Sequence, residues 1–251
     1  MSRIQILNVD SLTIQYPKTP TPAVVSISFG VGEGEVLGIL GGNGAGKSST
    51  LKAIAGLLPI SAGRIEVCGK FVSDIGSDKE YARELIGYCP DTGGLIRQAT
   101  VYEHLQIIMK NKARSIPEEL ALDIIEQMGL SEHLNNVSGG FSHGMARRLA
   151  VSIAALNAQK LLILDEPFDG VDPLGVEAIQ TIVKKAKESG LGVILSTHLL
   201  SLLAESTDRI LIMNKGKILH ETNSSDFRSP NAQSIYTSLL KADNDVNSIA
   251  G

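Results

Sequence analysis

Two short stretches of this sequence carry side chains that can hold a phosphate chain and a divalent cation. The first is GGNGAGKSS, residues Gly41–Ser49, and the second is LLILDE, residues Leu161–Glu166. The first stretch matches G-x-x-x-x-G-K-S at each fixed letter. Glycines let successive backbone N–H groups turn inward around an anion, and a following helix adds its positive N-terminal end. By itself, the pattern predicts binding of a nucleoside triphosphate.

Within the glycine-rich loop, Lys47 can reach the β and γ phosphates, and the Ser48 hydroxyl can ligate Mg²⁺. The motif requires a strand before the loop and a helix after it. The sequence predicts both, a strand over Val36–Leu40 and a helix over Ser49–Gly56. A chance glycine turn would lack these neighbours. The residues expected to bind ATP in this loop are Gly41, Asn43, Gly44, Ala45, Gly46, Lys47, Ser48 and Ser49.

The apolar run Leu161–Leu164 ends in two carboxylates, Asp165 and Glu166. A buried strand places such side chains at the carboxyl edge of a sheet, where α/β proteins bind ligands. Asp165 is expected to hold Mg²⁺ through a water molecule, and Glu166 to polarise the attacking water as general base. Phosphoryl transfer depends mainly on positioning and charge neutralisation, so few groups suffice. The alternative is an ordinary strand end with solvated acids, which the phosphate loop disfavours.

The elements around these motifs alternate between strands and helices, which predicts a mainly parallel α/β core. Strands are expected over Ile4–Tyr16, Val24–Val31, Val36–Leu40, Arg64–Lys70, Ile86–Cys89, Leu161–Leu164, Gly192–Ser196, Arg209–Met213 and Lys217–His220. Helices are expected over Ser49–Gly56, Val101–Lys112, Pro117–Gly129, Asp172–Ser189 and Leu199–Ser206.

Local signals support two of these helices. Thr100 and Glu103 form a capping-box pattern at the start of one of them. In the next, one side of the helix is expected to carry the apolar residues Leu120, Ile124, Ile125 and Met128.

The composition excludes some classes of protein. The chain has 251 residues and a net charge of −4, so it lacks the basic footprint of a bulk nucleic-acid binder. Residues Met1–Asp10 lack the apolar stretch of a signal peptide. No run approaches the roughly 18 apolar residues of a membrane helix, so any membrane role must come through a partner. Cys68 and Cys89 are interpreted as buried apolar residues in a reducing compartment.

The ordered motifs GGNGAGKSS, IGYCPD, FSHGMARR, LLILDEPFDGVDP and STH resemble those of the ATP-binding subunits of ABC transporters. The resemblance covers about Ile4–Phe227 and is strongest to the ATPases of ABC-2-type exporters. It implies a phosphate-loop α/β core, an antiparallel β part near the N-terminus and an inserted helical part at about 91–157. The ATP-binding domain is expected over 1–240, and the polar residues 241–251 are expected to be a disordered tail.

Two stretches compete for the family signature LSGGQ: VSGGF, which ends at Phe141, and FSHGM, which begins there. The family has a basic residue seven positions after the first signature residue, and Arg148 fits only FSHGM. The resemblance therefore implies that Ser142 and Gly144 are the signature contacts. Ser142 would cap a helix whose N-terminus faces the γ-phosphate bound by another subunit. His143 replaces a family glycine, and VSGGF is interpreted as a flexible loop leading into the helix.

Three further positions are carried over by the resemblance, and a fourth departs from the family pattern. His198, in Ser-Thr-His, matches the switch histidine that contacts the γ-phosphate, and Asp172 matches the aspartate of the loop that crosses the dimer interface. Tyr16 matches the aromatic residue that stacks on adenine. Asp91 stands where the family usually has Gln. We hypothesise that it reaches Mg²⁺ or the attacking water through a second water.

The resemblance implies two ATPase copies that sandwich two ATP molecules with Mg²⁺, as a homodimer by default or as a heterodimer with a related chain. It also implies a separate transmembrane permease subunit and a peripheral location on the cytoplasmic side of the cell membrane, with export favoured. One alternative is a soluble ABC-type ATPase, for example in iron–sulfur assembly. Another is a phosphate-loop kinase, which would leave FSHGM and STH unexplained.

Overall fold

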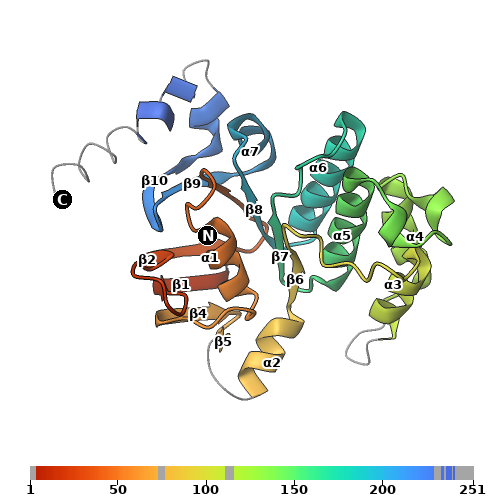
Figure 1. Cartoon of the computed structure of the whole chain (residues 1–251), viewed down its shortest axis with the longest axis horizontal. Helices are drawn as coiled ribbons and strands as arrows, with labels where there is room; N and C mark the ends of the chain where they lie inside the picture. Colours follow the sequence, from red (N-terminus) through yellow and green to blue (C-terminus); the bar gives the residue numbers. More distant parts are fainter. Residues whose placement is uncertain are drawn as a thin grey trace.

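Two β-sheets lie together at one end of the molecule and most of the helices lie at the other (Figure 1). The computed structural model describes residues 4–72, 77–110, 116–228, 233, 234, 236–238 and 240, with no side-chain description for 77–79. The predicted tail at 241–251 lies outside these residues, as do Asn111 and Lys112 at the end of one predicted helix. Within the described parts, no helix combines the length and apolar character needed to cross a membrane.

The N-terminal sheet is antiparallel throughout, in the order β2-β1-β4-β5. Its strands are β1 (Gln5–Ile14), β2 (Val24–Gly32), β4 (Ala62–Val67) and β5 (Lys70–Phe71). The chain turns between β4 and β5 at Cys68, whose φ is 50°. Cys68 is therefore exposed at a hairpin turn, so its interpretation as a buried residue is wrong, whereas Cys89 is buried as expected.

The second sheet has the order β10-β9-β3-β8-β7-β6 and is parallel except for the β9–β10 pair. Its strands are β3 (Val36–Leu40), β6 (Ile86–Cys89), β7 (Leu161–Asp165), β8 (Gly192–Thr197), β9 (Arg209–Asn214) and β10 (Lys217–Asn223). The mainly parallel core and the antiparallel N-terminal part expected from the sequence are both confirmed.

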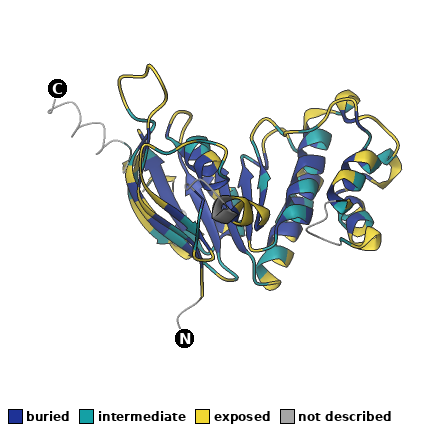
Figure 2. Cartoon of the chain, turned by 90° about the horizontal axis from the view of Figure 1, so that it is seen from below, coloured by how far each residue is buried: buried dark blue, intermediate teal, exposed yellow. Residues whose placement is uncertain are grey.

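Both faces of this parallel sheet are covered, which explains why its strands read as continuous apolar runs. Side chains alternate between faces along β7: Leu161 and Ile163 join the core beneath the N-terminal sheet, while Leu162 and Leu164 join the core beneath the helices. The central strands are accordingly buried along most of their length (Figure 2). The carboxyl end of β7 is thus buried where the chain reaches Glu166.

The helices are α1 (Lys47–Ile54), α2 (Ser77–Glu84), α3 (Val101–Met109), α4 (Glu118–Gln127), α5 (His143–Asn157), α6 (Pro173–Glu188) and α7 (Leu200–Ser206). Short 3-10 segments occupy Ser131–His133, Ser138–Gly140 and Ser224–Arg228. Helix α2 was not predicted from the sequence. In Figure 1, α3, α4 and α5 lie together, away from the N-terminal sheet. These three helices fall within the stretch expected to be an inserted helical part.

Helix α3 begins with the predicted capping box, whereas α4 buries a face that differs in part from the expected one. The capping box at α3 is confirmed, because the Thr100 and Glu103 side chains each bond the other residue's backbone N–H. In α4, the expected apolar side is partly wrong: Leu120 is 49% exposed, and Ala121 takes its place in the core with Ile125. The buried stripe is therefore rotated by one residue, which leaves Leu120 at its margin.

Candidate nucleotide-binding site

The glycine-rich loop connects β3 to α1 and lines a cavity. Gly46, with φ 104°, precedes the first residue of α1, and a Cβ there would stand 2.7 Å from the Ala23 carbonyl oxygen. Gly44 has φ 78° and faces open space, because no atom lies within 4 Å of its hypothetical Cβ. These conformations favour glycine and leave room for a ligand to approach the backbone. The loop lines a cavity of about 250 Å³ whose wall includes Asp91 and Glu166.

Lys47, the first residue of α1, directs its ammonium into this loop and is 6% exposed. The ammonium donates to the carbonyl oxygens of Gly41 and Gly42, at 2.7 and 3.3 Å. It also lies 3.1 Å from Oε1 of Glu166. The positive charge is therefore held where the phosphate chain is expected, and it is paired with a carboxylate of the chain itself.

Glu166 is fixed on both of its carboxylate oxygens and at its backbone. Oε1 faces Lys47, while Oε2 lies 3.1 Å from Nδ1 of His198. Its backbone is left-handed, with φ 48°, and its N–H donates at 3.1 Å to both the carbonyl oxygen and Oγ of Ser196. Strained backbone of this kind persists where the surroundings hold it and is concentrated at functional sites. The structure thus brings together Lys47, Glu166 and His198, the three residues expected to be catalytic.

Asp165 is fully buried at the end of β7. Its Oδ1 accepts a hydrogen bond from the Ser196 hydroxyl at 2.5 Å, whereas Oδ2 has no partner of ordinary geometry among the described residues. Burial raises the pKa of the Asp165 carboxyl, and hydrogen bonding from Ser196 and Ser48 opposes that rise. A buried carboxylate oxygen without a partner, next to the Ser48 hydroxyl, fits a cation ligand.

The described residues hold no cluster of three or more His, Cys, Asp or Glu side chains that could bind a metal by themselves. One carboxylate beside one hydroxyl is nevertheless a donor set that suits Mg²⁺, because this ion is usually bound through one or two carboxylates together with substrate phosphates and water. Asp165 and Ser48 would supply the protein oxygens. The residues present therefore fit the metal expected from the sequence.

Asp91 lies just beyond β6, at the wall of the same cavity, and its side chain is 53% exposed. Its Oδ1 is 3.3 Å from Nη2 of Arg147, a residue of α5 that sequence reasoning did not single out. The guanidinium of Arg147 also donates to the carbonyl oxygens of Pro90, Asp91 and Asp165. The spacing of the motif singled out its neighbour Arg148, which instead bonds the Met128 carbonyl oxygen.

The FSHGM stretch forms the N-terminus of α5. The Ser142 hydroxyl accepts a hydrogen bond from the Met145 N–H at 3.2 Å, so the predicted cap is confirmed. Gly144 is buried where an added Cβ would stand 2.9 Å from the Gly170 carbonyl oxygen. His143 is exposed beside Asp169, with 3.5 Å between Nε2 and Oδ2. None of Ser142, His143 and Gly144 lines the cavity at the glycine-rich loop.

The competing VSGGF stretch includes a 3-10 turn that is hydrogen-bonded to the loop before α3. Ser138 is buried in a 3-10 turn, and its hydroxyl donates to the Ile96 carbonyl oxygen at 3.0 Å. The Gly139 N–H donates to the Arg97 carbonyl oxygen. This stretch therefore connects the start of α5 to the loop before α3 through hydrogen bonds.

Asp172 and Tyr16 complete the set of expected site residues. Asp172 caps α6, because its Oδ1 accepts a hydrogen bond from the Gly175 N–H at 2.7 Å. The Tyr16 hydroxyl lies 3.1 Å from Oγ of Ser49, which places the ring beside the first turn of α1. Neither residue lines the cavity at the glycine-rich loop. Tyr16 is nevertheless positioned at the margin of the loop, where a base attached to the phosphates could reach it.

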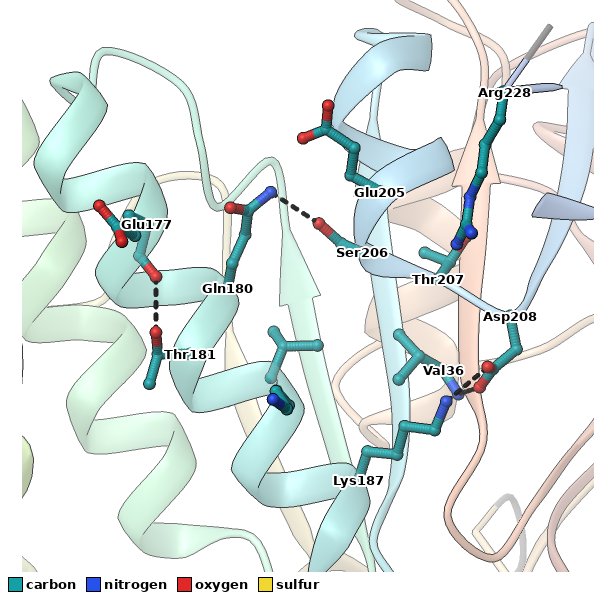
Figure 3. A pocket seen from close by; sticks show the side chains of 12 residues that line it. Val36, Glu177, Gln180, Thr181, Lys187, Glu205, Ser206, Thr207, Asp208 and Arg228 are labelled. Carbon is teal, nitrogen blue, oxygen red and sulfur yellow. Dashed lines mark hydrogen bonds and ion pairs between the residues drawn. The ribbon is translucent and has the colours of Figure 1, made fainter. Parts of the chain in front are cut away.

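A separate cavity of about 370 Å³ lies between α6 and α7 (Figure 3). Its polar lining is largely paired internally: Lys187 bonds Asp208 at 2.5 Å, and Gln180 bonds Ser206 at 3.1 Å. Asp208 also accepts a hydrogen bond from the Val36 N–H at the start of β3. The mixed charges and absence of a glycine loop in this lining distinguish it from a phosphate site. Through Asp208, this lining connects α6 to β3, the strand that leads into the glycine-rich loop.

Comparisons with known proteins agree with this geometry. The profile of the ABC transporter family matches residues 24–169. The chain is 36% identical to YhcH of Bacillus subtilis, an uncharacterized ABC transporter ATP-binding protein, over 80% of this chain and 65% of that one. It is 32% identical to LptB of Haemophilus influenzae, a lipopolysaccharide export system ATP-binding protein, over 86% and 90%. The dimeric structure of MJ0796, a bacterial ABC transporter cassette, superposes with a TM-score of 0.79 at 25% identity, over 87% and 99%.

Proposed function

This chain belongs to the ABC transporter family as an ATP-binding ATPase subunit, and on that basis we propose that two ATPase chains close head to tail over two ATP molecules. The observation that carries the proposal is the division of the site within one chain. Lys47, Glu166 and His198 meet at the glycine-rich loop, whereas Ser142 and Gly144 lie at the N-terminus of α5, outside that cavity.

A second copy would supply the missing half. The N-terminus of α5 carries the positive end of the helix dipole, which suits the γ-phosphate bound by the other chain. The solved dimer of MJ0796 supports such pairing for a cassette of this fold. A two-fold arrangement repeats the same contacts on both sides, so a homodimer is the simple assembly, and a related second chain could replace one copy.

In the proposed reaction, Glu166 accepts a proton from water as the water oxygen attacks the γ-phosphorus of ATP. The bond from the γ-phosphorus to the β–γ bridging oxygen breaks, and ADP leaves with that electron pair. Lys47 and His198 flank Glu166 and would neutralise charge on the transferred group. Before this can happen, Glu166 must release Lys47 to the phosphates.

Asp165 and Ser48 would hold Mg²⁺, with Asp91 reaching it or the attacking water through a second water. The metal would neutralise charge on the β and γ phosphates when it is bound. The adenine is proposed to stack on Tyr16, which lies beside Ser49 at the loop. Asp172, which caps α6 in this chain, is proposed to lie at the interface between the two copies.

We further propose that closure of the dimer drives a separate membrane-spanning subunit, with the ATPase chains peripheral on the cytoplasmic side. The described residues contain no candidate membrane helix, so a transport role requires such a partner. LptB serves an export system by its name, which supports export for this chain. Cargo choice would then belong to the membrane subunit.

The test is purification of the tagged chain from its native cell in mild detergent, with ATPase assay and mass spectrometry of what co-purifies. A multi-span membrane protein in fixed stoichiometry with an active ATPase is the expected result. Reproducible recovery of soluble partners alone, with ATPase activity intact, would instead favour a soluble ABC-type ATPase.

A further inference from the structure

Arg147 forms a buried connection between three parts of the site. It lies one turn after His143 in α5 and is only 2% exposed. Its Nη1 donates to the carbonyl oxygens of Pro90 at 3.0 Å and Asp165 at 3.4 Å. Its Nη2 donates to the carbonyl oxygen of Asp91 and, at 3.3 Å, to Oδ1 of the same residue. One side chain thus links the signature helix to the ends of β6 and β7.

The buried charge of Arg147 is compensated by carbonyl oxygens and by one carboxylate. A buried guanidinium must be paired or well solvated by protein oxygens, because an uncompensated buried charge is strongly destabilising. Asp91 supplies the only carboxylate that pairs with Arg147 among the described residues. The carbonyl oxygens of Pro90 and Asp165 hold the guanidinium at the ends of β6 and β7. The Asp91 carboxylate is half-exposed, so it can turn toward solvent while these hydrogen bonds to the carbonyl oxygens remain.

We propose that Arg147 is a positioning residue that couples the N-terminus of α5 to Asp91 and to the Asp165 end of β7. This inference rests on the proposed function, in which Asp91 and Asp165 face the metal and the attacking water. A movement of α5 would pull on the Asp91 turn through the guanidinium. The planar fork of arginine suits several oxygens at once, whereas a lysine ammonium is a single point charge.

The first test is a double-mutant cycle on ATPase activity of the full chain, with Arg147→Gln, Asp91→Ala and the double variant. We expect Arg147→Gln to lower kcat about tenfold while KM for ATP changes less than about twofold. Because Arg147 and Asp91 belong to one hydrogen-bond network, the effects of the two substitutions should not be additive. In the Asp91→Ala background the same change should cost about threefold or less. Equal losses in both backgrounds would overturn the coupling. If the Gln variant does not fold, Arg147→Lys replaces it in the cycle, and its kcat should be lower than that of the wild-type chain in the Asp91 background.

The matched control is Arg148→Gln, because Arg148 bonds the Met128 carbonyl oxygen and makes no contact with Asp91. Its effect on kcat should be the same whether residue 91 is Asp or Ala. A second readout is amide hydrogen exchange in a peptide over residues 91–95, where the Gly93 N–H bonds the Pro90 carbonyl oxygen at 2.9 Å. Arg147→Gln should speed this exchange, and Arg148→Gln should leave it unchanged.

Unchanged exchange in the Arg147→Gln protein would overturn the proposal even if kcat falls. The proposed function fails separately, if the wild-type chain binds no ATP or hydrolyses none. In that case the exchange experiment still reports whether Arg147 holds the Asp91 turn.

Discussion

The ammonium of Lys47 lies 3.1 Å from Oε1 of Glu166, so the cation expected to hold the γ-phosphate is paired with the carboxylate expected to activate water. Both side chains are largely buried, which strengthens the pair relative to one at the surface. ATP and Glu166 therefore compete for Lys47 in the nucleotide-free chain. The ion pair also keeps the general base close to its working position before ATP arrives.

Replacing Glu166 with Gln should separate binding from hydrolysis. The amide cannot accept the proton of water, so kcat should fall about 100-fold or more. ATP affinity should be retained or increased, because the phosphates no longer compete with a carboxylate for Lys47. Light scattering after size-exclusion chromatography with ATP should show accumulated dimers.

The control for this variant is Glu188→Gln, which removes an exposed carboxylate at the end of α6. It should keep wild-type turnover and should not accumulate dimers. Normal turnover in the Glu166→Gln protein would remove Glu166 as the base.

Asp165→Asn should stabilise the nucleotide-free chain at neutral pH and abolish stabilisation by ATP with Mg²⁺. Because burial raises the pKa of Asp165, the wild-type chain loses stability as pH rises from the ordinary carboxyl value of about 3.8 through the raised value. The Asn variant has no such loss. Its advantage in Tm should therefore be absent at the acid end and grow toward neutral pH.

Thermal unfolding between pH 4 and 8, with and without ATP and Mg²⁺, measures both effects. A wild-type chain that is more stable than the Asn variant at pH 7 without ligand would show that burial does not dominate at this carboxyl.

Ser142→Ala should weaken both the α5 cap and the proposed contact with the partner's nucleotide. Loss of a serine cap costs about 1 kcal/mol, and in a chain of this size that lowers Tm by about 2–4 °C. Thr100→Ala is the matched control, because Thr100 caps α3 and does not line the glycine-loop cavity. Both variants should lose similar Tm, but only Ser142→Ala should reduce ATP-driven dimerisation. Equal dimerisation by the two would assign Ser142 to capping alone.

Tyr16→Ala should raise KM for ATP about fivefold or more, because stacking of a base on an aromatic ring contributes about 1–3 kcal/mol. The kcat should change little, since the Tyr16 hydroxyl bonds Ser49 and not one of the three residues proposed to act on the γ-phosphate. Tyr16→Phe keeps the ring and loses only that hydrogen bond, so its KM should stay near wild type. A KM in the Ala variant equal to wild type would place adenine elsewhere.

Asp91→Ala should lower kcat about tenfold or more, if Asp91 helps to place the attacking water for the general base. ATP affinity, measured with a fluorescent analogue, should remain largely intact. Asp91→Gln restores the residue that the family usually carries and should recover part of the activity. Turnover unchanged in the Ala variant would exclude Asp91 from the reaction.

The sequence by itself determined the chemistry at the loop and at the end of β7. Glycine, lysine, serine and paired carboxylates at those spacings have few other uses, and apolar runs bounded by caps located most of the strands and helices. The capping box of Thr100 and the caps made by Ser142 and Asp172 were readable because each depends on residues within three positions.

Only the tertiary structure decided which distant side chains meet. The pairing of Glu166 with both Lys47 and His198 depends on the order of β3, β8 and β7 in one sheet. Arg147 reaches Asp91 across 56 residues, and local spacing carries no signal for such a contact. The exposure of Cys68 and Leu120 likewise depends on a turn and on a helix rotation. Burial and ion pairing are set by the summed packing of remote segments, which no single motif contains.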